Sequence, residues 1–196
     1  MSLASAYTVL APFYDRVVSG ATRPLRQASL AHLPAAPADV LLVGVGTGLD
    51  LPHLPAAHRY TGVDFNAAML ARSRPRASGL DFVAVRGDAM KLPFADACFD
   101  CAVLHLIVAV VPDGRAVLQE AARVLRPGGQ ALLLDKFLRR GRPAPLRRLL
   151  SPLAARVATR LDVVLEDALD GLPFGVVSDD AAAFGGWFRQ VRLLRT

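Results

Sequence analysis

The feature that most constrains this chain is a glycine-rich loop that directly follows an apolar run. Residues Val40–Val43 are continuously apolar, which is typical of a strand buried on both faces of a parallel sheet. Gly44, Gly46 and Gly48 follow at alternate positions. Glycines let a backbone turn sharply and approach a ligand, and the next helix offers free N–H groups. This pattern predicts a nucleotide-like ligand, whereas Leu49 at the third glycine position of GxGxxG disfavours a dinucleotide.

Strands and helices alternate after this loop. Apolar runs predict strands at 60–63, 80–85, 99–107 and 130–134, and helical patterns cover 66–77 and 113–125. A helix at 161–169 and two strands at 174–178 and 187–194 follow, with the two strands as an antiparallel pair at the sheet edge. The alternation indicates an α/β fold with a parallel sheet and helices on both faces. Because such sheets bind ligands at the carboxyl ends of their strands, the residues that follow strands are the site candidates.

Two aspartates stand at such positions. Asp64 ends the second strand, 20 residues beyond Gly44, where a carboxylate can accept hydrogen bonds from ribose hydroxyls. Its alternative role is that of an acid at a helix N-terminus. Asp88 follows the third strand, where it can accept from an adenine amino group while the neighbouring backbone N–H reaches a ring nitrogen. Its alternative role is that of a turn aspartate after Gly87.

Four further residues are candidates on the substrate side. His105, inside the longest apolar run, is either a satisfied core residue or a general base. Asp135 ends the fifth strand and is either a substrate-side carboxylate or a helix-side cap. Tyr7 and Tyr14 precede the first strand. They are either packing residues or aromatic faces above a bound cation.

Composition excludes several classes of protein. The 196 residues fit one domain, and the net charge of +6 suggests an anionic partner, either a phosphate-bearing ligand, a membrane surface or nucleic acid. Cys98 and Cys101 have no second Cys or His pair at zinc-site spacing, so we expect free thiols in a reducing cytosol and no metal. The longest apolar stretch, 102–112, is shorter than the about 20 residues that span a bilayer, and the N-terminus lacks signal-peptide features.

The segment Lys136–Arg160 is strongly basic and amphipathic. It contains eight Lys or Arg residues and no acid, with leucines at helical spacing. One interpretation is a solvated surface helix, and the other is an interfacial element attracted to anionic lipid. Nucleic acid is the less favoured partner, because few aromatic residues interleave the basic ones and no nucleic-acid-binding module is recognisable.

Taken together, the motifs resemble those of the class I S-adenosylmethionine-dependent methyltransferases. The resemblance runs from Val40 to Asp135, through VLLVGVGTGLDLP, YTGVDFNAAMLARSR, GDAMKLPFADACFD, VVPD and RVLRPGGQALLLD in that order. Within that class the chain is most similar to the bacterial phosphatidylethanolamine N-methyltransferases and also resembles quinone-biosynthesis methyltransferases.

The resemblance implies a Rossmann-like, doubly wound sheet of seven strands, mostly parallel, with the last strand antiparallel. It implies S-adenosylmethionine as cofactor and S-adenosylhomocysteine as product. The cofactor-binding positions that it implies are Gly44, Val45, Gly46, Gly48, Asp64, Phe65, Asp88 and Ala89. The family usually has an acid two residues before the first glycine, which helps to organise the loop and the methionyl end of the cofactor. Leu42 stands there in this chain, and Asp50 is a candidate substitute.

These inferences predict one methyltransferase domain. It comprises a helical cap at 1–36, a cofactor-binding core at 37–135, a basic acceptor-side insertion at 136–160, and a closing helix with antiparallel strands at 161–196. Three functions stay open: methylation of a lipid or lipophilic molecule, such as a phospholipid head-group amine, methylation of a soluble metabolite, and cofactor binding without catalysis. We expect a cytoplasmic location, with peripheral contact to anionic membranes under the first alternative.

Overall fold

The centre of the structure is a seven-stranded sheet. The computed structural model describes residues 20, 22–141, 144, 145, 147, 149, 151, 159–183 and 186–196. The strands are β1 (Asp39–Val43), β2 (Arg59–Asp64), β3 (Asp81–Arg86), β4 (Phe99–His105), β5 (Leu125–Asp135), β6 (Phe174–Ala183) and β7 (Phe188–Arg195). Their order in the sheet is β3-β2-β1-β4-β5-β7-β6. The first five are parallel, and β7 lies antiparallel between β5 and β6, which confirms the predicted fold class.

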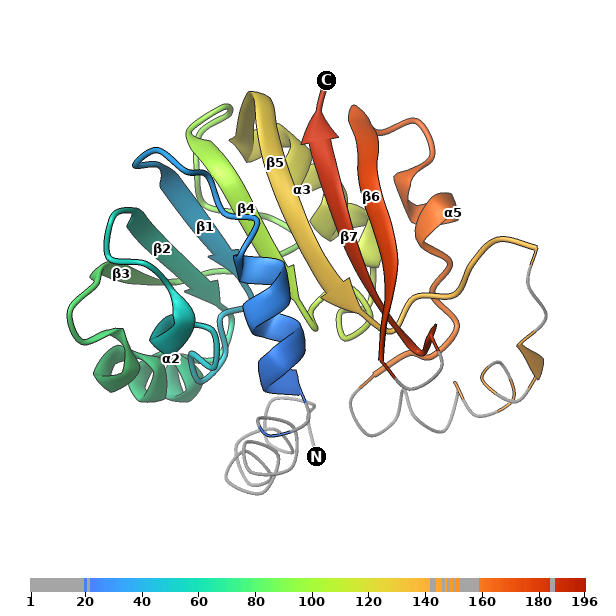
Figure 1. Ribbon diagram of the computed structural model, residues 1–196, viewed down its shortest axis with the longest axis horizontal. Coiled ribbons are helices and arrows are strands. Elements are labelled where there is room, and N and C mark those ends of the chain that lie inside the picture. Colours follow the sequence, from blue (N-terminus) through green and yellow to red (C-terminus); the bar gives the residue numbers. More distant parts are fainter. Residues whose placement is uncertain are drawn as a thin grey trace.

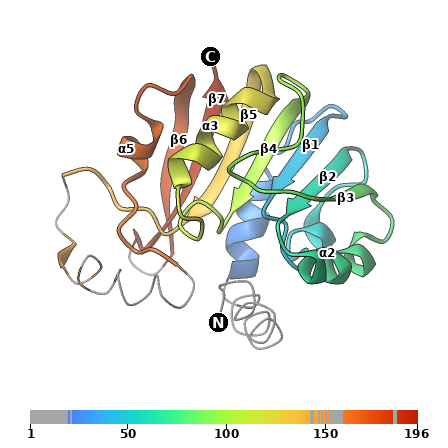
Figure 2. The same ribbon diagram turned by 180° about the vertical axis from the view of Figure 1, so that it is seen from behind.

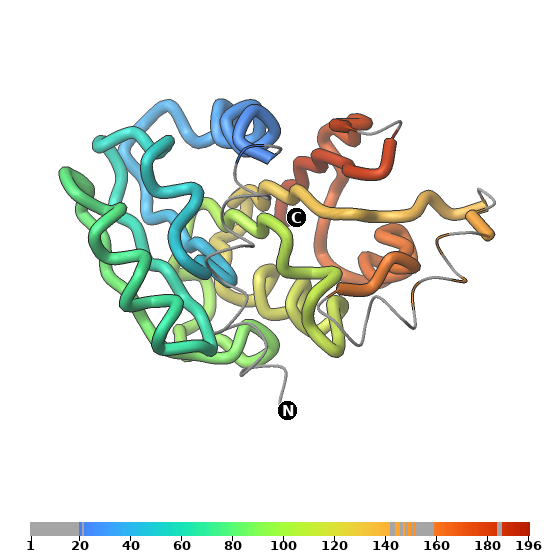
Figure 3. The backbone as a smooth tube through the Cα atoms, turned by 90° about the horizontal axis from the view of Figure 1, so that it is seen from below, coloured from blue at the N-terminus to red at the C-terminus, as the bar shows by residue number. Residues whose placement is uncertain are grey.

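Helices cover both faces of this sheet. The helix of residues 22–30 lies on one face, while α3 (Gly114–Val124) and α5 (Leu165–Leu169) lie on the other (Figures 1, 2 and 3). The 3₁₀ turn η1 (Leu51–His53) and the helix α2 (Ala67–Ser73) pack with the first of these faces through Leu51 and Leu70. None of the helices in the described part of the chain is long and apolar enough to cross a membrane.

Strand β1 is buried from both sides, as its continuous apolar run predicts. Leu41 and Val43 face the core below α3, and Leu42 faces the core below the helix of residues 22–30. Because β1 pairs with β2 on one side and with β4 on the other, the chain connections diverge at its carboxyl end. That divergence is the switch point at which open α/β sheets bind ligands.

Capping residues fix where the helices begin. Asn66 caps α2, and its side chain accepts a hydrogen bond of 2.9 Å from the Ala68 amide. Asp113 caps α3 by accepting from the Ala116 amide at 3.1 Å. The helix predicted over 66–77 is α-helical only to Ser73 and continues as the 3₁₀ turn η2 (Arg74–Ala77). Pro75 explains this change, because it has no N–H to donate and its ring clashes with an α-helical preceding turn.

Strand boundaries differ from the predicted ones at the end of the chain. Strand β5 begins at Leu125 rather than at residue 130, because Leu125 pairs with Phe99 before residues 126–129 bulge out and pairing resumes at Gln130. Strand β6 continues to Ala183, five residues beyond its predicted end, because it pairs along nearly the whole of β7. The predicted helix 161–169 is helical only over Leu165–Leu169.

Candidate functional site

A cavity of about 490 Å³ lies at the carboxyl ends of β1, β2 and β4. Its volume is within the roughly 300–1,000 Å³ of small-molecule and cofactor sites. Most sequence-predicted site residues come together here. The lining residues are Arg26, Gly44, Val45, Gly46, Thr47, Leu49, Asp50, Asp64, Phe65, Asn66, Met69, Asp88, Met90, His105, Leu106, Ile107, Val110, Val111 and Pro112.

The glycine loop has the backbone that its sequence predicts. Gly44, Gly46 and Gly48 have φ values of +66°, +56° and +81°, a region that other residues rarely adopt. A Cβ on Gly44 would lie 2.6 Å from Cδ1 of Ile107, so the loop also packs too closely there for a side chain. Gly44 and Gly46 line the cavity, whereas Gly48 packs behind the loop, where a Cβ would lie 2.6 Å from Cδ1 of Leu51.

Asp64 connects β2 to this loop. Its Oδ2 accepts from the Gly46 amide at 2.9 Å and its Oδ1 accepts from the Asn66 amide at 2.8 Å. Burial raises the pKa of Asp64, and the two amide hydrogen bonds offset this only in part. The carboxylate therefore holds the glycine loop in place and borders the cavity at the same time.

Of the residues predicted to bind near the adenine of the cofactor, some line the cavity and one is buried in the core. Asp88 lines the cavity, and its Oδ1 accepts from the Met90 amide at 2.8 Å, which is also the geometry of a turn aspartate. Phe65 lines the cavity with 62% of its surface exposed. The Ala89 side chain belongs to the buried core, so only its backbone remains to contact a ligand.

His105 belongs to a buried polar cluster in the cavity wall. Its Nδ1 lies 2.9 Å from Oδ1 of Asp50, and its Nε2 lies 2.9 Å from Oγ of Ser29. Arg26 donates to the same Asp50 oxygen at 2.9 Å. Burial raises the pKa of Asp50, but the charges and hydrogen bonds of His105 and Arg26 outweigh it and hold the pKa well below its ordinary value. Asp50 is therefore ionised at neutral pH.

Of the other substrate-side candidates, only Asp135 belongs to the described residues. Asp135 is fully buried, and its carboxylate accepts from the amides of Ala109 and Lys136 at 2.9 and 2.8 Å. These contacts fix the turn that follows β4, and Asp135 is not among the residues that line the cavity, so its two predicted roles stay predictions. Tyr7 and Tyr14 lie outside the described residues, as do many residues of the basic segment 136–160.

The segment that follows β4 forms an apolar wall of the cavity. Leu106, Ile107, Val110, Val111 and Pro112 all contribute to it. Leu106 has a φ of +59°, which is strained for a residue with a side chain. The hydrogen bond from its amide to the Leu134 carbonyl, 2.8 Å long, helps to hold this conformation.

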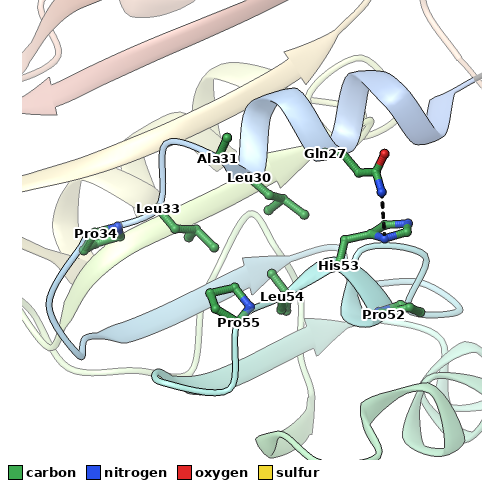
Figure 4. A pocket seen from close by; sticks show the side chains of 9 residues that line it. All are labelled: Gln27, Leu30, Ala31, Leu33, Pro34, Pro52, His53, Leu54 and Pro55. Carbon is green, nitrogen blue, oxygen red and sulfur yellow. Dashed lines mark hydrogen bonds between the residues drawn. The ribbon is translucent and has the colours of Figure 1, made fainter.

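A second hollow, of about 590 Å³, lies between the helix of residues 22–30 and residues 52–55 (Figure 4). Prolines and leucines make up most of its lining, and the glycine loop and the aspartates described above do not reach it. The cavity at the strand ends is therefore the candidate site.

Sequence reasoning missed most residues of the apolar wall and also Arg26 and Ser29, the partners of Asp50 and His105 on the helix of residues 22–30. Both are buried on one face of the helix of residues 22–30, together with Thr22 and Leu30. Positions 22, 26, 29 and 30 have the spacing of a helix face that is normally apolar. Polar residues at that spacing were the signal that would have identified them.

The strand order, the glycine loop and the carboxylate after β2 define an α/β protein that binds a nucleoside-containing cofactor. Residues 41–133 match the family model described as methyltransferase domain. The chain is 33% identical over 187 residues to phosphatidylethanolamine N-methyltransferase of Cereibacter sphaeroides, covering 93% of this chain and 92% of that protein. It therefore belongs to the S-adenosylmethionine-dependent methyltransferases.

Two other known proteins are similar. Demethylmenaquinone methyltransferase of Mycobacterium sp. (strain KMS) is 36% identical over 139 residues, which cover 68% of this chain and 59% of that protein. The solved structure of a SAM-dependent methyltransferase from Thermotoga maritima matches all of both chains with a TM-score of 0.75 at 19% identity, which supports the fold.

The residues of the cavity fit S-adenosylmethionine, a nucleoside joined through a sulfonium to an amino acid. A carboxylate at the end of β2 and a second one after β3 suit hydrogen bonds to a nucleoside. A buried guanidinium and a buried carboxylate at another part of the wall suit charged groups. The glycine loop between them leaves backbone without side chains on the cavity side.

Proposed function

We propose that this chain transfers the methyl group of S-adenosylmethionine to a lipid or lipophilic acceptor, and specifically to a phospholipid head-group amine. The observation that carries the proposal is the extent of the likeness to the Cereibacter sphaeroides enzyme, which covers 93% of the chain. It continues well beyond residues 41–133, which match the general methyltransferase model. The likeness to the demethylmenaquinone enzyme covers only 68%.

The apolar wall after β4 supports a lipophilic acceptor. Five consecutive or nearly consecutive positions between Leu106 and Pro112 present apolar side chains to the cavity. An acyl or other apolar group next to such a wall loses water-exposed surface, which is favourable by roughly 25 cal/mol per Å². A small, strongly hydrated metabolite gains nothing comparable from that wall.

In this proposal the cofactor occupies the cavity between the glycine loop and the aspartates. Gly44, Val45 and Gly46 border it, with Gly48 shaping the loop from behind. Asp64 accepts from the ribose hydroxyls, with Phe65 alongside. On the adenine side, Asp88 accepts from the amino group while the backbone of Ala89 reaches the ring.

Bound S-adenosylmethionine supplies an electrophilic methyl group on a sulfonium. The chain's own contribution is to hold both reactants in line and to keep water out. An amine acceptor needs only to be unprotonated, because its lone pair forms the new bond. An oxygen acceptor needs a base, for which His105 stays a prediction. Both ring nitrogens of His105 are hydrogen-bonded to Asp50 and Ser29 in this structure.

In this proposal the basic segment 136–160 covers the acceptor side, between the core and the closing strands. The same segment contacts anionic membranes. Leu149 in that segment is 77% exposed. Arg139, Arg140 and Arg160 pair with aspartates at 2.8, 2.7 and 3.3 Å, which reduces the local positive charge. We therefore expect membrane binding that is weak and lost at high salt.

The test is methyl transfer from labelled S-adenosylmethionine to vesicles that contain phosphatidylethanolamine, followed by extraction and separation of the lipids. Label in N-methylated phosphatidylethanolamine is the expected result, and the Asp64→Ala variant should lose it. Parallel reactions contain phosphoethanolamine, demethylated quinones, and total lipid or small-molecule extracts.

Other outcomes separate the alternatives. Label only in water-soluble products would favour the second function, methylation of a soluble metabolite. Cofactor binding without label in any extract would favour a binding protein without catalysis. Absence of co-sedimentation with anionic vesicles at low salt would reject the membrane contact alone.

A further inference from the structure

The cavity wall contains a buried chain of polar groups that the proposed nucleoside contacts do not use. Ser29, His105, Asp50 and Arg26 are connected in that order by three contacts of 2.9 Å. Each of the four residues is at most 7% exposed. Because Asp50 is ionised and its carboxylate can only accept, Nδ1 of His105 carries the hydrogen in their shared bond.

The helix that carries Arg26 and Ser29 is held firmly over the cavity. On its outer side Gln27 contacts Nδ1 of His53 in η1 at 3.4 Å (Figure 4). The Leu25 carbonyl accepts from Gln190 of β7 at 2.5 Å. The helix is therefore tied both to the turn that follows Asp50 and to the sheet.

Arg26 and Asp50 retain capacity for a ligand. Both line the cavity. The contacts of Asp50 with other described side chains fall on Oδ1, and a carboxylate has a second oxygen with two further lone pairs. Within the described part of the chain, Arg26 donates through Nε to Thr22 and through Nη1 to Asp50, which uses two of the five guanidinium N–H groups. A buried pair of opposite charges with spare donors and acceptors is complementary to a zwitterion.

The residue two positions before the glycine loop offers no polar group to a ligand. Leu42 is 2% exposed and packs with Leu30 and Leu51. That core lies on the face covered by the helix of residues 22–30, the same helix that carries Arg26. The glycine loop itself is held by the hydrogen bond from the Gly46 amide to Asp64, which lies at the nucleoside side of the cavity. Binding of the amino-acid end still needs a residue.

We propose that Arg26 and Asp50 together bind the amino-acid end of S-adenosylmethionine. Asp50 accepts from the α-ammonium group and Arg26 donates to the α-carboxylate. His105 and Ser29 are positioning residues that hold the Asp50 carboxylate. This assignment rests on the methyltransferase function but not on the identity of the acceptor.

Calorimetry with two ligands tests the assignment. S-adenosylhomocysteine contains the amino acid, whereas 5′-methylthioadenosine has the same nucleoside without it. For Asp50→Asn and Arg26→Gln we expect affinity for S-adenosylhomocysteine to fall by at least about 10-fold, and affinity for 5′-methylthioadenosine to change less than about 2-fold. Asp64→Ala should weaken both ligands. Asp39→Asn, which removes a carboxylate paired with Arg59 at the opposite end of β1, should weaken neither.

A double variant protects the test against misfolding, because each single change leaves a buried charge without its partner. In the double variant Arg26→Gln/Asp50→Asn neither side chain is charged. It should still lose affinity for S-adenosylhomocysteine and keep its affinity for 5′-methylthioadenosine. If the double variant regained wild-type affinity, the pair would be purely structural. The assignment would also be overturned if Asp50→Asn weakened the binding of both ligands equally, or if it weakened the binding of neither.

The positioning role of His105 has its own readout. The side-chain amide of His105→Asn can replace the Nδ1–H donor, so this variant should keep most of its S-adenosylhomocysteine affinity. His105→Leu should lose that affinity while retaining 5′-methylthioadenosine. Equal behaviour of the two variants would reject the role. Wild-type protein that binds neither ligand would instead reject the methyltransferase function itself, and failure to methylate lipid with both ligands bound would reject only the acceptor.

Discussion

The amide of Gly46 donates to Oδ2 of Asp64 across 2.9 Å, so a carboxylate at the end of β2 holds the loop that leaves β1. The same carboxylate borders the cavity. Loop geometry and ligand contact therefore depend on one side chain, which gives Asp64 the largest expected effect among the predicted site residues.

Asp64→Ala should reduce S-adenosylhomocysteine affinity by about 10- to 100-fold. Hydrogen bonds to a charged group contribute about 1.5–3 kcal/mol, and each 1.4 kcal/mol is tenfold in affinity. Titration calorimetry measures the change, with Asp100→Ala as the control, because Asp100 is a carboxylate near the opposite end of β4 that pairs with Arg126. Unchanged affinity in the Asp64 variant would refute its ribose contact.

Acid should weaken nucleoside binding through Asp64. Its pKa in the free protein is raised by burial, and the ribose contact needs the ionised form. As pH falls through this raised pKa, Asp64 of the free protein takes up a proton, which must be released when the nucleoside binds. An ordinary aspartate has a pKa of about 3.9, so the affinity should begin to decline at a higher pH than it would with an ordinary aspartate. The measurement is the affinity of wild-type protein and of Asp64→Asn for 5′-methylthioadenosine from pH 7 to 4. Protonation of the ligand affects both proteins equally, so it cancels in the ratio of the two affinities. A ratio independent of pH would contradict the prediction.

Gly44→Ala should destabilise the fold more than Gly79→Ala. Both glycines have positive φ, +66° and +82°, so both changes strain the backbone. Only at Gly44 does the new Cβ meet a side chain, Cδ1 of Ile107 at 2.6 Å, whereas Gly79 has open space around it. Overpacking adds about 1–3 kcal/mol, measurable by urea unfolding. Ile107→Ala in the Gly44→Ala background should recover the steric part, and equal costs at the two glycines would show that no close approach exists.

Arg189→Met should destabilise the sheet edge by about 1.5–3 kcal/mol, the contribution of hydrogen bonds to charged groups. Arg189 is 2% exposed and donates to Glu166 at 2.9 Å and to Asp179 at 2.6 Å, and both acids are partly buried. Its removal takes this donor from Glu166, whereas Asp179 keeps its pair with Arg139. Arg140→Met is the matched control, because its pair with Asp167 is 60% exposed on both sides and exposed pairs contribute about 0.2–1 kcal/mol. Thermal and urea unfolding of both variants test the difference, and a small effect at Arg189 would mean that its acids find other donors.

Local sequence patterns were sufficient to predict the fold class. The apolar run before Gly44 predicted a strand buried on both faces, and β1 lies in the interior of the sheet, between β2 and β4. Asn66 begins the predicted helix 66–77, and its side chain accepts from two amides of α2 as an N-cap. Such features depend on neighbours in sequence, which is why they are readable from it. The bulge at 126–129 and the pairing of β6 with β7 moved strand boundaries, because these limits depend on pairing with other strands. The shortening of α2 has a local cause, Pro75.

The sequence by itself determined the family, the glycine loop and the aspartates that follow β2 and β3, since each stands at a fixed distance from a recognisable strand. Only the tertiary structure decided what surrounds His105. Its partners Asp50 and Ser29 are 55 and 76 residues away along the chain, and they meet because a helix folds back over the end of β4. Hydrogen bonds between residues so far apart leave no local pattern, so the partners of His105 could be identified only from the fold.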